Sequence, residues 1–153
     1  MIRNIFVLAL ILLFSGLIGC SGSSISEGVK LSSIRTPDPN RKPIEMKISR
    51  AALRSAVADL GTLNRARLVE VFFREQEVGG SPPEYRMFDI APGSAYDILG
   101  LKNADVLVAA DDYIVPSAPV FRTYVSLLPT QRDGSIEIRR MGQSMLFHYN
   151  FVD

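Results

Sequence analysis

The sequence has 153 residues, with 17 Lys and Arg against 16 Asp and Glu, and its net charge at pH 7 is +1. This balance provides no basic face for nucleic acid, so we expect no nucleic-acid partner. The length suits one domain, and the single cysteine, Cys20, excludes an internal disulfide and a cysteine-cluster metal site.

The first 19 residues have the pattern of an export signal. Arg3 supplies a positive charge, and residues 5–18 are apolar except for Ser15 and Gly16. A membrane-spanning helix needs about 20 apolar residues, whereas this run is shorter and precedes the polar residues 21–24. A cleaved signal peptide is therefore the first interpretation, and an uncleaved membrane helix is the second.

Cys20 stands at the end of this apolar run. The stretch LIGC, residues 17–20, resembles a bacterial lipobox, in which the cysteine is acylated and the chain is cleaved just before it. The resemblance implies a lipoprotein signal peptide over residues 1–19 and lipidation of Cys20, with ordinary secretory cleavage as the alternative. We expect no catalytic or metal-binding role for this cysteine.

The residue after the cysteine bears on the location. An Asp at this position signals inner-membrane retention in enteric-type sorting, and here the position is occupied by Ser21. The expected location is therefore the bacterial cell envelope, with the lipid anchor in the periplasmic face of the outer membrane rather than in the inner membrane.

Residues 20–46 differ in composition from the rest of the chain. They are rich in Ser, Pro, Gly and charge and hold few side chains able to pack, which is typical of a flexible tether. The folded domain is then predicted over residues 47–153.

The first half of this domain is predicted to hold a helix and three strands. Ser49 suits the N-cap of a helix that ends at Gly61; its core-facing positions are Leu53, Ala56, Val57 and Leu60. Residues 68–75 predict a strand buried on both faces. Residues 85–90 predict a short strand, residues 95–101 a single helical turn and residues 105–110 a buried strand.

A second helix and a hairpin complete the domain. Over residues 116–129, Ser117 suits the N-cap, Pro119 lies in the first turn and Pro129 ends the helix. Its apolar residues cover more than a narrow stripe, so this helix either lies deep or presents an apolar edge to a ligand. Residues 135–141 and 145–152 predict an antiparallel hairpin with a turn at Gly142-Gln143.

Residues 90–107 carry a family resemblance. The stretch IAPGSAYDILGLKNADVL resembles a bacterial PDZ domain, in which an apolar strand end is followed by P-G-S, then G-L, then G-D-V and an Asn-Gly turn. Ala104 stands where the usual pattern has Gly. Asp111-Asp112 replaces the usual Asn-Gly, so we expect a longer or differently shaped turn there.

Residues 48–152 are most similar to the C-terminal periplasmic domain of the type II secretion system component C family. The leading helix, the tract RMFDI at residues 86–90 and Tyr96 before Leu99-Gly100-Leu101 carry this similarity. It implies an α+β fold class: a single PDZ-like domain, built as a small, partly open antiparallel β-barrel or sandwich with two helices.

The resemblance also implies peptide recognition by strand addition. It makes Tyr85–Ile90 the edge strand and Ser117–Leu128 the helix of the groove. The candidate peptide contacts are Tyr85, Arg86, Phe88, Ile90, Phe121, Tyr124, Val125 and Leu128, although for most of the apolar ones a place in the core is the commoner arrangement. Because residues 85–88 contain no glycine to form a carboxylate-binding loop, internal segments are expected in preference to free C-termini.

No residue pattern points to catalysis. His148 is the only histidine, Ser94 lacks the G-x-S-x-G frame of a nucleophile elbow, and Asp111 and Asp112 read as solvated turn carboxylates. We expect no enzyme, no metal and no cofactor.

The first functional hypothesis is an envelope lipoprotein that binds a secretin, another secretion-machine protein or an exported substrate segment in type II protein secretion. The alternative is an adaptor or scaffold in periplasmic quality control and proteolysis. A purely structural role in an envelope assembly is the third interpretation.

Overall fold

The computed structural model describes residues 37–71 and 83–153. The predicted signal peptide, Cys20 and residues 20–36 of the predicted tether lie outside the described residues. The described strands are β1 (Lys42–Ser49), β2 (Arg67–Val71), β3 (Glu84–Phe88), β4 (Val106–Ala110), β5 (Tyr113–Ile114), β6 (Asp133–Arg140) and β7 (Gln143–Val152). The helices are α2 (Arg50–Ala58), α3 (Leu60–Arg65), α4 (Ala95–Ile98) and α5 (Ala118–Leu127), with a 3-10 turn η2 (Leu128–Thr130).

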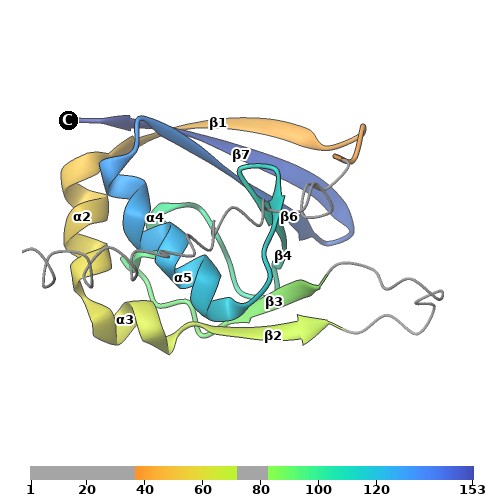
Figure 1. The fold of residues 1–153 in the computed structure, drawn as a ribbon, viewed down its shortest axis with the longest axis horizontal. Helices are drawn as coiled ribbons and strands as arrows, with labels where there is room; N and C mark the ends of the chain where they lie inside the picture. Colours follow the sequence, from red (N-terminus) through yellow and green to blue (C-terminus); the bar gives the residue numbers. More distant parts are fainter. Residues whose placement is uncertain (1–36, 72–82) are drawn as a thin grey trace, which may run out of the picture. The chain divides into compact units, whose positions relative to one another are not determined.

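The strands form one open sheet in the order β1-β7-β6-β4-β3-β2, with β5 paired to β4. Figure 1 shows β1 and β7 along one side of the described domain and β2 and β3 along the opposite side. The α+β class and the partly open sheet are confirmed. Two details of the prediction are wrong: β1 runs parallel to β7, and the described residues contain four α-helices rather than two.

Strand β1 overlaps the predicted tether. Lys42–Met46 belong to the strand, so the predicted boundary at residues 46/47 lies too late. Ile44, Met46 and Ile48 alternate along it and pack against the core, because successive side chains of a strand point to opposite faces. The intervening charged residues gave this segment the composition of a tether.

The first predicted helix is divided in two. Ser49 caps α2 as predicted, and its side chain accepts a hydrogen bond from the Ala52 N–H. The helix ends at Ala58, because the Asp59 carboxylate accepts from the N–H groups of Gly61 and Thr62 and starts α3. Gly61 is therefore not a helix stop, and the predicted core residue Leu60 is exposed.

The segment around the P-G-S turn follows the prediction closely. The Ser94 hydroxyl caps α4 by accepting from the Asp97 N–H, and the Asp97 carboxylate accepts from the Gly93 N–H. Asp105 is 1% exposed and accepts from the Lys102 N–H at 2.7 Å and from Arg140. Ala104 lies in the left-handed region with φ +72°, a conformation that ordinarily favours glycine.

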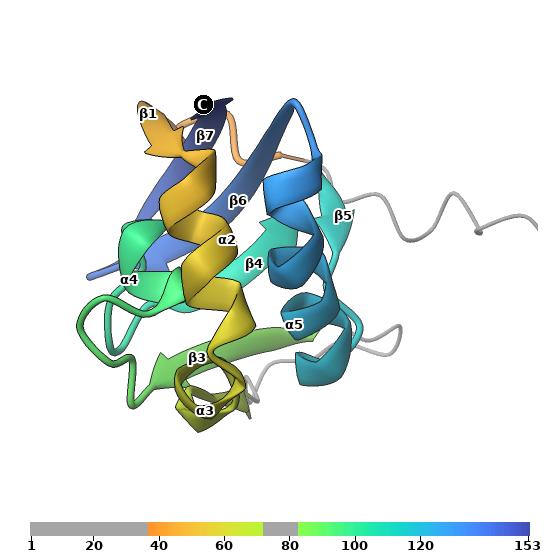
Figure 2. The ribbon, with the colours of Figure 1, turned by 90° about the vertical axis from the view of Figure 1, so that its left-hand side faces the viewer.

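Helices α2 and α5 lie side by side over the core (Figure 2). Ser117 caps α5 and a proline occupies its first turn, as predicted. The β6–β7 turn is Met141-Gly142, both with positive φ, one residue earlier than predicted. The largest fully buried side chains are Tyr96, Tyr149, Phe121, Leu53, Met87, Leu99 and Leu101.

Candidate functional site

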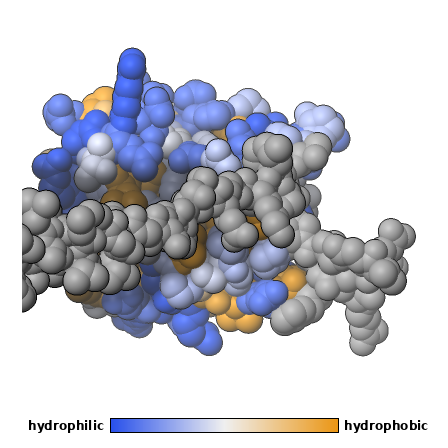
Figure 3. Space-filling view, in the orientation of Figure 1, coloured by the Kyte–Doolittle hydropathy of each residue, from blue (hydrophilic) through white to orange (hydrophobic). Residues whose placement is uncertain are grey.

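Strand β2 forms one edge of the sheet. It pairs with β3 on one side, and no strand of residues 37–71 and 83–153 pairs with its other side. Val69 is 46% exposed, so the predicted burial of this strand on both faces is wrong; residues 72–75 of that prediction lie outside the described residues. Hydrophobic surface lies at the lower margin of Figure 3, where Figure 1 places β2.

The predicted edge strand is an inner strand. β3 pairs with β2 on one side and with β4 on the other, so the assignment of Tyr85–Ile90 as the peptide-binding edge is wrong. The burial of this strand agrees with its inner position. Glu84, Tyr85 and Met87 are all buried, as expected for a strand with neighbours on both sides.

The hydrogen bonds of β3 determine in which direction the backbone N–H and C=O groups of β2 point. The Met87 N–H donates to the Asp105 carbonyl and the Met87 carbonyl accepts from the Ala104 N–H, so both groups point away from β2. Leu68, which lies opposite Met87, is therefore in a non-hydrogen-bonded pair. It follows that the backbone N–H and C=O groups of Leu68 and Glu70 point to the free side of β2.

Helix α5 flanks β2 and is held at two points. The Arg122 guanidinium donates to the carbonyl of Ala66, the residue before β2, at 3.3 Å. At the other end, the Tyr85 hydroxyl donates to the carbonyl of Pro116, just before α5, at 2.9 Å. Because Tyr85 lies opposite Glu70, the two contacts fix α5 alongside both ends of β2.

The side chains of Leu68 and Glu70 lie on the α5 side of the sheet. Both share a face with the buried residues opposite them, Met87 and Tyr85. Burial and then the charge of Glu70 raise the pKa of the Tyr85 hydroxyl, which agrees with a carboxylate close to that ring. Val69 lies on the other face, opposite the exposed Arg86.

The predicted contact residues on α5 mostly belong to the core. Phe121, Val125 and Leu128 are each 0% exposed, so they support the helix and cannot line an open groove. The Tyr124 hydroxyl donates to Asp111 at 3.0 Å. The Tyr124 and Phe121 rings stack with centroids 6.2 Å apart.

The predicted contacts on the β3 side do not line an open groove beside α5 either, although Tyr85 reaches the residue before that helix. Tyr85 is buried and Phe88 is half-buried beneath Arg67, whose guanidinium carbon is 5.8 Å from the ring centroid. Arg86 is exposed on the face away from α5. Ile90 follows the strand, and its N–H donates to the Asn103 side chain at 2.9 Å.

Sequence reasoning missed the residues that do flank the free edge, namely Ala66, Leu68, Glu70 and Arg122. One signal for them was present: Arg122 is the single charged residue of helix α5. Its Nε atom is buried and makes no hydrogen bond within the described part of the chain, and the buried Tyr96 hydroxyl is also unpaired there. Burial raises the pKa of Tyr96, and the neighbouring Arg122 opposes that rise.

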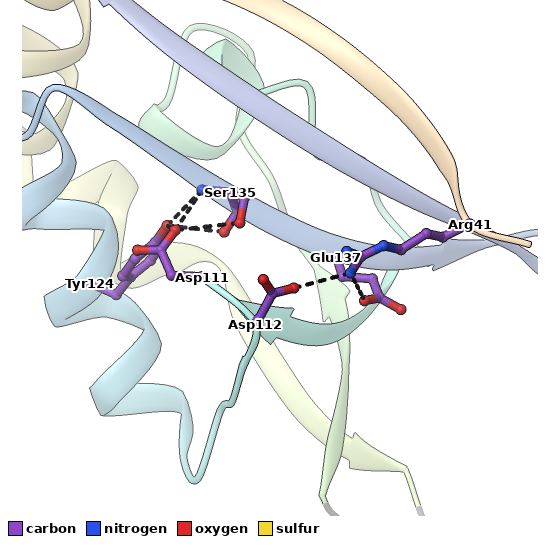
Figure 4. Close-up of polar contacts among 6 residues, drawn as sticks. All are labelled: Arg41, Asp111, Asp112, Tyr124, Ser135 and Glu137. Carbon is purple, nitrogen blue, oxygen red and sulfur yellow. Dashed lines mark hydrogen bonds and ion pairs between the residues drawn. The ribbon is translucent and has the colours of Figure 1, made fainter. Parts of the chain in front are cut away.

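A polar network fixes the β4–β5 turn (Figure 4). One Asp111 oxygen accepts from the Ser135 N–H at 2.7 Å and from the Tyr124 hydroxyl. Arg41 donates to Asp112 at 3.1 Å and to Glu137 at 3.0 Å. The network therefore ties the turn to α5, to β6 and to the residue before β1.

Asp111 and Asp112 form a tight two-residue turn. Their φ angles are +49° and +62°, and the flanking residues Ala110 and Tyr113 pair directly. Two central residues with positive φ are typical of the hairpin turn that Asn-Gly usually makes. The expectation of a longer or differently shaped turn is wrong, because the Asp111 carboxylate stabilises this conformation through the network.

The described residues contain no candidate metal-binding cluster. No group of three His, Cys, Asp or Glu side chains there could hold a metal ion. Ser94 is buried and serves as a helix cap, and His148 lies opposite Ser135 on β6. None of the described helices is long and apolar enough to cross a membrane.

No protein-family model and no curated protein matches the sequence. Among solved structures, the chain is similar to a longer and a shorter form of the PDZ domain of EpsC from Vibrio cholerae. The longer form has 22% identity and a TM-score of 0.40, over 66% of this chain and 93% of that chain. The shorter has 20% identity and a TM-score of 0.35, over 58% of this chain and 97% of that chain.

Proposed function

We propose that the described domain is a non-catalytic binding module that captures an extended protein segment as an added strand on β2, beside α5. The observation that carries this proposal is the free edge of β2, where Leu68 and Glu70 direct backbone donors and acceptors outward. An unpaired strand edge is a template for pairing with another chain, and the flanking helix can select side chains of that chain.

The proposed partner is a secretin, another protein of a type II secretion machine, or an exported substrate. Support for it is the similarity of residues 48–152 to the component C family, carried by the RMFDI and LGL tracts. The lipobox-like residues 17–20 support lipidation at Cys20 and a place on the periplasmic face of the outer membrane. An adaptor role in periplasmic quality control remains the second proposal, since it uses the same edge.

The test uses two substitutions at one position of the full chain. Glu70→Pro removes the outward N–H of β2, and proline is tolerated at a strand edge whose N–H faces solvent. Glu70→Ala removes the same carboxylate but keeps the N–H. Partners are crosslinked in the cell envelope and identified by mass spectrometry.

Secretion-machine proteins lost with Glu70→Pro and retained with Glu70→Ala are the expected result. A protease and its clients in their place would favour the quality-control role. Equal capture by both variants would refute strand addition at β2.

A further inference from the structure

The two ends of the free edge of β2 differ in charge, with Arg122 of α5 near the start and Glu70 further along. Arg122 holds the carbonyl of Ala66 and so stands at the start of the free edge, next to Leu68. Glu70 lies two residues further on, where Tyr85 contacts the residue before α5. A strand added to β2 therefore meets a cation at one end and an anion at the other.

Arg122 and Tyr96 both have unused hydrogen-bonding capacity at this place. The Arg122 Nε–H and the Tyr96 hydroxyl contact each other, but neither makes a hydrogen bond of good geometry within the described residues. A buried donor without a partner costs free energy and calls for an explanation. A carboxylate brought in by a bound segment would pair with the Arg122 guanidinium, which already stands at the Ala66 carbonyl.

We infer that the segment captured at β2 carries a basic residue opposite Glu70 and, two residues later, a carboxylate opposite Leu68 that pairs with Arg122. This inference rests on the proposed function. Antiparallel pairing is the more stable and more frequent arrangement, and it fixes this order along the segment. Residues two apart in a strand point to the same face, so both side chains face α5.

The residue between the two charges is apolar. It lies opposite Val69, which is exposed on the outer face of the sheet, and cross-strand apolar pairs stabilise a sheet. The structure thus selects an extended pattern of basic, apolar and acidic residues.

The test measures binding of synthetic peptides to the full chain by fluorescence anisotropy. Four labelled octapeptides of threonine and valine have blocked ends and differ in the charges that flank a central valine. They carry lysine then aspartate, aspartate then lysine, two aspartates, or glutamine then asparagine. A fifth peptide replaces the aspartate by a free C-terminal carboxylate at the same position, which separates the two sources of a carboxylate.

The lysine-then-aspartate peptide is expected to bind about tenfold more tightly than the reversed one, because in the reversed peptide both ion pairs, with Glu70 and with Arg122, become contacts between like charges. Glu70 is exposed, so the variant Glu70→Lys should fold normally. In this variant the peptide with two aspartates should become the tightest binder, and misfolding cannot produce such a gain in affinity.

Equal affinity for all the blocked peptides would overturn the charge order while leaving strand addition at β2 intact. Tighter binding of the reversed peptide would overturn the antiparallel order. Tighter binding of the peptide with the free C-terminus would overturn the inference that the captured segment is internal. If none of the peptides binds, the inference and the proposed function are both overturned.

Discussion

Asp105 is expected to be the most sensitive carboxylate of the domain. It is 1% exposed, and its two oxygens accept from the Arg140 Nε and Nη2 atoms, each at 2.7 Å, and from the Lys102 N–H at 2.7 Å. Asp105→Asn keeps the shape but removes the charge and points an amide donor at another donor. Arg140 is then left without its counter-ion.

The magnitude follows from the burial of the pair. Removing one partner of a buried ion pair costs about 3–5 kcal/mol, and the Arg140 side chain is 24% exposed, so we expect the lower end, about 3 kcal/mol. The free energy of unfolding of a domain is about 5–15 kcal/mol, so this loss is a large share of it. Urea titration at pH 7 measures it as a shift of the midpoint at constant m-value.

A matched control is the same substitution at an exposed pair. Asp89 contacts Arg67 at 2.6 Å, but the two side chains are 48% and 65% exposed. Asp89→Asn is expected to cost less than about 1 kcal/mol, and asparagine tolerates the positive φ at this position. Equal losses at Asp105 and Asp89 would refute the argument from burial.

Three further predictions concern stability. Ala104→Gly should raise the free energy of unfolding by about 1 kcal/mol in the same titration, because alanine at φ +72° is strained; no gain would refute the strain. Gly134→Ala should lower it by about 1–3 kcal/mol, since the added Cβ would lie 2.7 Å from a Leu128 methyl carbon; a neutral effect would show that Leu128 moves freely. Burial and then Asp111 raise the pKa of the Tyr124 hydroxyl, so the folded domain holds this proton more tightly than the unfolded chain. The resulting stability is complete below about pH 10 and falls above it by up to about 1.4 kcal/mol per pH unit; Tyr124→Phe should reduce that slope in alkaline titrations, and an unchanged slope would contradict the assignment.

Local hydrogen-bonding signals explain what could be predicted from the sequence. Ser49 and Ser117 each cap the helix expected of them, because a short side-chain oxygen before an apolar helical pattern has few other roles. Asp105 likewise holds the entry to β4, as the PDZ-like pattern indicates.

Strand pairing between residues distant in the sequence explains which features of the fold could not be predicted. The charges of Lys42, Glu45 and Lys47 concealed a strand that exists because β7 offers a parallel edge. The apolar residues of β2 suggested a strand buried on both faces, and the family resemblance made β3 the edge strand, yet β2 is the edge and β3 is the inner strand. The position of a strand within a sheet depends on partners distant in the sequence, and alternation alone does not reveal it.

The dependence on long-range packing also explains why the site residues were predicted only in part. Phe121 and Val125 have the character of ligand contacts, but packing of α5 on the sheet turns them into the core. Arg122, one residue from Phe121, reaches Ala66 only because the fold brings the start of β2 beside α5.

The central claim is that a partner strand adds to β2, and amide hydrogen exchange of the full chain with and without a bound segment tests it most directly. The N–H groups of Leu68 and Glu70 point outward, whereas that of Val69 already faces β3. Binding should therefore slow exchange at Leu68 and Glu70 and leave Val69 almost unchanged. Slowing confined to β1, or no slowing along β2 while the segment is bound, would contradict the account.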